Sequence, residues 1–148
     1  MSREKAPGRS EFLLFQPVTT RWMDNDIYGH VNNVTYYSYF DTAVNRYLIE
    51  SGGLDIHHGG VIAFVVNSSC QYFSPVAYPD ELEVGMRVDH LGNSSVNYGV
   101  SIFRKGEQTA CANGQFVHVF VRRDTGKTTP IPDNLREALT KLMPTPQE

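Results

Sequence analysis

The chain has 148 residues, a length that fits one domain with a single hydrophobic core. Its 13 Lys and Arg against 16 Asp and Glu give a formal net charge of −3, so no positive excess favours nucleic acid or an anionic membrane as a partner. Eight Tyr, eight Phe and one Trp in a chain that is 41% hydrophobic indicate a folded protein with an aromatic-rich interior.

Cysteine usage and the N-terminal composition predict a soluble, cytoplasmic protein. Cys70 and Cys111 lack the spacing of a zinc ribbon or a redox pair, so we expect two buried thiols. The apolar run that follows the polar residues 1–10 covers only 12–15, far too short for a signal peptide or a membrane span. We expect a flexible segment over 1–10 and a single domain over 11–148.

The predicted elements begin with a strand and one long helix. Alternating side chains over 15–23 predict the strand. Over about 34–50, buried positions recur at spacings of three and four, as in a helix with one apolar stripe: Tyr37, Phe40, Val44 and Tyr47 or Leu48. Asn32 or Asn33 is expected to cap the start of this helix, and Gly52-Gly53 to end it.

Four further strands are predicted over about 61–73, 80–91, 95–104 and 108–121, separated by short turns. Consecutive strands with short connections favour an antiparallel meander. Asp133 is expected to cap a short C-terminal helix with Leu135, Leu139 and Leu142 on its inner face. This order predicts an α+β fold in which five antiparallel strands wrap around the long helix, and the remaining sheet edge favours a homodimer.

Several common sites are excluded by the residues present. The sequence contains no G-x-S-x-G elbow, phosphate-binding glycine loop, H-E-x-x-H or dinucleotide fingerprint. Asp24-x-Asp26 is a poor calcium loop because Thr35 stands where the bidentate Glu is needed. The adjacent pair His57-His58 has no further ligands around it, so we expect no metal site.

The segment 24–33 has the composition of a reactive loop, since two acidic residues precede the start of the only long helix. The first helical turn carries free N–H groups and a partial positive charge of roughly +0.5, which suits a polarised carbonyl or an oxyanion. A carboxylate opposite this turn could act on an activated acyl group. The same residues also suit a purely structural role, with Asp24 and Asp26 forming turns, Gly29 at positive φ and Asn32 as the cap.

The loop Asp-Asn-Asp-Ile-Tyr-Gly-His-Val-Asn-Asn over 24–33, followed by the aromatic helix start over 36–40, resembles the hot-dog-fold acyl-CoA thioesterases of the 4-hydroxybenzoyl-CoA thioesterase-like family. The resemblance extends through Trp22, the Tyr-Phe-Ser-Pro of 72–75, Gly85, the turn over 91–95, Ala112-x-Gly114 and the Pro-Ile-Pro-Asp of 130–133. It implies a hot-dog fold, a homodimer or homotetramer, and hydrolysis of an acyl-CoA to free acid and coenzyme A without a metal or redox cofactor.

By position, the resemblance places the catalytic carboxylate on Asp26, as nucleophile or general base, and the oxyanion donor on the backbone N–H of Asn33. Gly29, His30 and Asn32 would shape the site, with His30 holding the loop or orienting water. Asp41 stands where many relatives have Glu, which leaves no clear role for this position.

Coenzyme A phosphates require cations, and Arg104 and Lys105 are the first candidates, followed by Arg87, Arg122 and Arg123. Tyr36, Tyr37 and Phe40 are candidates for the acyl pocket, although the same stripe fits an ordinary core. The runner-up function is a non-catalytic module that binds acyl-CoA or an acyl carrier protein. A hot-dog dehydratase ranks last because the sequence lacks its paired His and acid.

Overall fold

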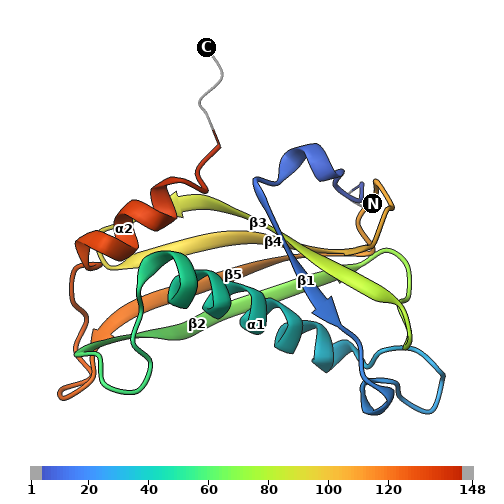
Figure 1. Cartoon of the computed structure of the whole chain (residues 1–148), viewed down its shortest axis with the longest axis horizontal. Coiled ribbons are helices and arrows are strands. Elements are labelled where there is room, and N and C mark those ends of the chain that lie inside the picture. The colour runs from blue at the N-terminus through green and yellow to red at the C-terminus, as the bar shows by residue number, and fades with distance from the viewer. Residues whose placement is uncertain (1–4, 145–148) are drawn as a thin grey trace.

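The computed structural model describes residues 5–144 and shows one antiparallel sheet curved around a long helix (Figure 1). The strands are β1 (Leu14–Thr19), β2 (Val61–Tyr72), β3 (Glu81–Leu91), β4 (Ser95–Arg104) and β5 (Ala112–Arg122). The helices are α1 (Asn33–Gly52) and α2 (Asp133–Thr140), with short 3-10 turns η1 (Arg9–Glu11) and η2 (Trp22–Asp24). This architecture confirms the predicted α+β hot-dog fold.

The strand order in the sheet is β1-β3-β4-β5-β2, with every neighbouring pair antiparallel. The predicted meander is correct for β3, β4 and β5 but wrong for β2, which pairs with β5 at the far edge. The connection over 73–80 is longer than a hairpin turn and contains Pro75 and Pro79, so it carries the chain away from β2 instead of folding it back. One side of β2 is therefore an edge of the sheet.

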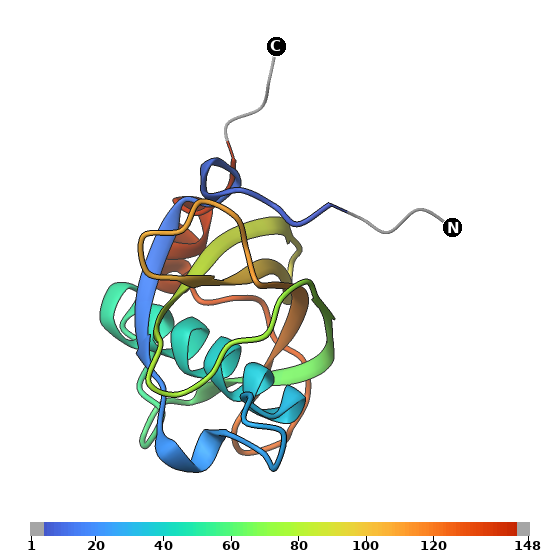
Figure 2. The same ribbon diagram turned by 90° about the vertical axis from the view of Figure 1, so that its right-hand side faces the viewer.

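Helix α1 lies in the concave face of the sheet, as Figures 1 and 2 show. Its inner stripe includes side chains that are essentially fully buried: Phe40, Ala43, Val44 and Leu48. Both predicted ends are confirmed, because Asn32 Oδ1 accepts a hydrogen bond from the Val34 N–H (3.1 Å) and Gly53 ends the helix at φ 70°. The start of α1 is thereby fixed at one end of the molecule (Figure 2).

The first strand is shorter than predicted, because β1 ends at Thr19 and residues 22–24 form η2. The Thr20 hydroxyl donates to the Asp80 carbonyl, and the Arg21 N–H donates to the Asp24 carboxylate (2.9 Å), which turns the chain out of the sheet. Trp22, which the predicted strand over 15–23 included, is consequently outside β1 and 79% exposed.

Smaller differences occur elsewhere in the fold. β5 begins at Ala112, since residues 105–111 form the turn that contacts the N-terminal segment. Cys111 is buried as predicted, but Cys70 is only half-buried because it lies on the edge strand. Asp133 is the first residue of α2 and Pro132 occupies the cap position, while the three predicted leucines are buried.

Residues 1–4 of the expected flexible segment lie outside the described residues. Within its described part, Gly8 forms a bridge with Thr109 and Arg9 pairs with Glu83 (2.8 Å). The Arg9 guanidinium also lies over the rings of Phe15 and Phe103, each at 4.9 Å. The folded unit therefore reaches back to Gly8. Among the described residues, no helix combines the length and the apolar character needed to cross a membrane.

Candidate active site

The loop that precedes α1 is folded by its own backbone. The Asp26 N–H donates to the His30 carbonyl (2.8 Å), and the Gly29 N–H donates to the Asp26 carbonyl (3.0 Å). Gly29 has a φ of 79°, a conformation that other residues adopt only with strain. Gly29 therefore shapes the loop and does not line the cavity beside it.

Asp24 anchors this loop to the helix. Its carboxylate is 3% exposed and accepts hydrogen bonds from the Tyr39 hydroxyl (2.8 Å) and from the Arg21 backbone and guanidinium. Burial alone would raise the pKa of Asp24, but the hydrogen bonds from Tyr39 and Arg21 together lower it below its ordinary value. The Asp24 carbonyl also accepts from the Asn32 N–H (2.9 Å), so the buried acid positions the residue that caps α1.

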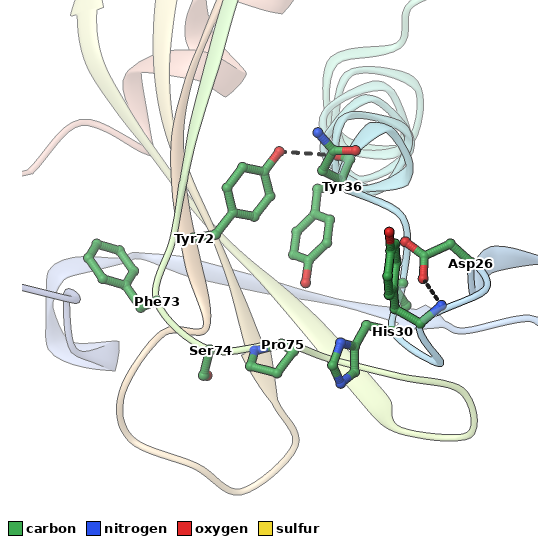
Figure 3. A pocket seen from close by; sticks show the side chains of 10 residues that line it. Asp26, His30, Tyr36, Tyr72, Phe73, Ser74 and Pro75 are labelled. Carbon is green, nitrogen blue, oxygen red and sulfur yellow. Dashed lines mark hydrogen bonds between the residues drawn. The ribbon is translucent and has the colours of Figure 1, made fainter.

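A cavity of about 440 Å³ opens beside the start of α1. Of the five residues predicted for the catalytic loop and helix start, three line it, namely Asp26, His30 and Asn33. The remaining lining residues come from the loop, the first turn of α1, the last residue of β2 and the segment that follows β2 (Figure 3): Tyr28, Val31, Tyr36, Tyr72, Phe73, Ser74 and Pro75. The structure thus brings the predicted carboxylate and the predicted helix start to one cavity.

The Asp26 side chain is held by one hydrogen bond and keeps an oxygen free. Its Oδ1 accepts from the Tyr28 N–H at 2.9 Å, as the dashed line in Figure 3 shows. Within residues 5–144, no hydrogen-bond donor reaches Oδ2. The side chain is half-buried, so a fixed carboxylate with one unengaged oxygen faces the cavity.

The first turn of α1 supplies an electropositive end to the same cavity. Asn32 binds the Val34 N–H through its side chain and accepts from the Thr35 N–H (2.9 Å) through its carbonyl, whereas the Asn33 N–H has no acceptor within the described chain. The Tyr72 hydroxyl donates to the Asn33 carbonyl (3.1 Å) and ties β2 to the helix start (Figure 3). A free N–H at a helix N-terminus suits an oxygen that gains negative charge.

The wall opposite the helix is fixed by backbone hydrogen bonds over 73–76. The N–H groups of Phe73 and Ser74 both donate to the Cys111 carbonyl (2.8 and 3.1 Å). The Val31 N–H donates to the Val76 carbonyl (2.8 Å), which joins this wall to the loop that carries Asp26. The cavity is therefore preorganised on both sides.

Comparison with known proteins shows to which family the chain belongs. Residues 18–139 match the thioesterase-like superfamily, which covers most of the chain and all of the site. The chain belongs to this superfamily. It is accordingly a thioester hydrolase with the hot-dog fold.

Solved structures agree with this membership of the thioesterase-like superfamily. The PA5185 protein of Pseudomonas aeruginosa is 59% identical, with a TM-score of 0.94 over 96% of this chain and 99% of that one. The PA2801 protein of the same species is 30% identical, with a TM-score of 0.80 over 86% and 98% of the two chains. The 1,4-dihydroxy-2-naphthoyl-CoA thioesterase Slr0204 of Synechocystis, at 20% identity and a TM-score of 0.77 over 86% and 96%, shares the fold.

Arg104 and Lys105 do not line the cavity of this thioesterase-like chain. Arg104 pairs with Glu107 (3.1 Å) and Asp80 (3.5 Å) and donates to the Pro75 carbonyl, so its guanidinium supports the cavity wall from behind. Lys105 forms an exposed ion pair with Glu81 (3.4 Å).

The three candidate acyl-pocket residues occupy different environments in the structure. Tyr36 lines the cavity, Tyr37 lies outside it, and Phe40 is fully buried as ordinary core. The contribution of Tyr72 to the helix start was not predicted. The sequence pointed to Tyr72 only as part of the Tyr-Phe-Ser-Pro segment. Its contact with Asn33 could not be predicted, because it depends on where β2 lies in the sheet.

Proposed function

We propose that this thioester hydrolase acts on an acyl-CoA, with Asp26 as nucleophile or general base and the Asn33 N–H as oxyanion donor. The observation that carries the proposal is that one cavity contains both the Asp26 carboxylate, with an oxygen free, and the helix start with the free Asn33 N–H. Membership of the thioesterase-like superfamily supports the reaction type.

In the proposed reaction the thioester carbonyl oxygen accepts a hydrogen bond from the Asn33 N–H, and the helix start stabilises the negative charge that develops there. Asp26 then attacks the carbonyl carbon, the C–S bond breaks, coenzyme A leaves as the thiolate, and water hydrolyses the resulting mixed anhydride. Alternatively, Asp26 takes a proton from a water molecule that attacks the same carbon. Both routes yield the free acid and coenzyme A, and both use only Asp26, the helix start and water.

The other predicted residues serve this geometry. Gly29 and Asn32 set the loop conformation and the helix start, while the exposed His30 holds the loop through its carbonyl and presents its ring to the cavity, where it can orient water. For the coenzyme phosphates we keep Lys105 and Arg104 as candidates. Lys105 can exchange its exposed ion pair at little cost, whereas Arg104 would have to leave the cavity wall.

We further propose that the chain forms a homodimer or homotetramer through the free edge of β2. This edge presents unpaired backbone groups together with three consecutive exposed apolar residues, Phe64 (56%), Val65 (43%) and Val66 (58%). A two-fold axis through the edge would pair β2 with its own copy in antiparallel orientation and continue the sheet across both chains.

The test measures thiol release from a panel of short, long and aromatic acyl-CoAs by native protein and by Asp26→Asn. Asn retains an acceptor for the Tyr28 N–H but loses the charge, so we expect kcat to fall at least about 100-fold without loss of folding. Asp124→Asn, which alters an exposed carboxylate paired with Arg122, is the matched control and should keep native activity.

Two outcomes contradict the proposal. Native turnover by Asp26→Asn would remove Asp26 from the mechanism. Binding of acyl-CoA by native protein without any thiol release would instead support the non-catalytic binding module.

A further inference from the structure

Tyr36 forms the inner wall of the cavity, and its hydroxyl points into the open space. The residue lies in the first turn of α1 and is 3% exposed. Its ring packs edge-on against Tyr72, with centroids 4.9 Å apart and planes at 86°. Figure 3 shows the Tyr36 hydroxyl directed into the space bordered by Asp26, His30 and Pro75.

The Tyr36 hydroxyl has an unused proton. Among the cavity residues drawn in Figure 3, none accepts a hydrogen bond from the Tyr36 O–H. Burial raises the pKa of Tyr36 above its ordinary value, so the phenol stays protonated at neutral pH and can donate. Three other tyrosines packed against the core differ, since each donates to a specific acceptor: Tyr39 to Asp24, Tyr47 to the Ala138 carbonyl and Tyr72 to the Asn33 carbonyl.

A thioester bound as proposed above would place its acyl group at the wall formed by Tyr36. The thioester carbonyl must lie near the Asn33 N–H, so that of its two substituents, the acyl group and the coenzyme A sulfur, one points into the cavity and the other toward solvent. The coenzyme is large and charged, so in the bound thioester it must extend out of the open side of the cavity, where Tyr28 is 82% exposed. The acyl group therefore extends toward Tyr36. A plain hydrocarbon there would cover a polar O–H without giving it an acceptor, which is unfavourable.

We propose that Tyr36 is a specificity-determining residue whose hydroxyl donates to an oxygen on the acyl group. The enzyme would therefore prefer compact acyl-CoAs that carry a hydroxyl or keto oxygen over hydrocarbon acyl-CoAs of the same length. This inference rests on the proposed function, because it assumes that the thioester binds between Asp26 and the Asn33 N–H.

The test compares kcat/KM within two matched pairs of substrates, 3-hydroxybutyryl-CoA with butyryl-CoA and 4-hydroxyphenylacetyl-CoA with phenylacetyl-CoA. We expect native protein to favour the oxygen-bearing member of at least one pair by about tenfold. In Tyr36→Phe this ratio should fall to about one, because Phe has no hydroxyl to donate to the oxygen of the acyl group. Because each ratio comes from a single preparation, a partly unfolded variant does not alter it.

The matched control is Tyr47→Phe, which removes a buried hydroxyl from the same helix away from the cavity and should keep the native ratio. Equal native rates within both pairs would overturn the inference, as would an unchanged ratio in Tyr36→Phe. An equal loss on both members of a pair would also overturn it, since that result assigns the hydroxyl to the reaction of every substrate. Failure of the proposed function is distinct, because native protein would then hydrolyse none of the four thioesters.

Discussion

Acidification from pH 7 to pH 4 is predicted to destabilise the protein by about 3 kcal/mol through one buried side chain, His118. This residue lies on the inner face of β5 and is 1% exposed. Three aromatic rings surround it, those of Tyr98, Phe116 and Phe120, and the Tyr98 hydroxyl lies 3.2 Å from its Nδ1. Burial in this apolar setting lowers the pKa of His118 from 6.5 to about 4.

The direction of the effect follows from proton binding. Between pH 6.5 and about 4 the unfolded chain binds a proton at His118 that the folded chain does not bind. The stability of the folded state is therefore complete above pH 6.5 and decreases as the pH falls toward 4. At about 1.4 kcal/mol for each pH unit, and with the folded-state ring already half protonated at pH 4, the loss amounts to about 3 kcal/mol.

The assay is urea unfolding at pH 7 and at pH 4, at a fixed protein concentration, for native protein and for His118→Phe. The variant lacks the titrating ring, so its loss of stability between the two pH values should be smaller than the native loss by about 3 kcal/mol. Carboxylates such as Asp24 affect both proteins alike and cancel in the comparison. Equal pH dependence of the two proteins would refute the reasoning.

Two further predictions concern packing and assembly. Gly114→Ala should lower the unfolding free energy, measured by urea titration, by about 1–3 kcal/mol. A Cβ at this position would meet the Ser69 carbonyl and lie 2.9 Å from the Phe40 ring. A variant as stable as native protein would contradict this packing. Sedimentation velocity should give a dimer or tetramer for native protein and a lower mass for Val66→Lys, which places a charge on the free β2 edge. A native monomer would exclude the proposed assembly.

Local signals predicted the parts of the fold that are built locally. The capping side chain of Asn32 and the left-handed Gly53 are adjacent to the helix that they bound, so both ends of α1 were readable. The turns at 92–94 and 105–107 likewise specified the pairing of β3, β4 and β5. The sequence also predicted that Asp26 and the helix start lie near each other, because only six residues separate Asp26 from Asn33.

Long-range contacts account for what the sequence did not predict. The place of β2 beside β5 depends on sheet order, which hydrophobic periodicity does not encode. The cavity wall exists because the Val31 N–H reaches the Val76 carbonyl across the chain. For the same reason, the sequence did not predict that Arg104 supports this wall or that the Tyr36 hydroxyl faces the cavity.

In the proposed mechanism, a thioester binds between the Asp26 carboxylate and the start of α1. The most direct measurement is a crystal structure of Asp26→Asn with an intact acyl-CoA. We expect the thioester oxygen to lie within hydrogen-bond distance of the Asn33 N–H and the side chain at position 26 to face the carbonyl carbon. A thioester bound away from the helix start, with residue 26 turned from it, would exclude the proposed mechanism.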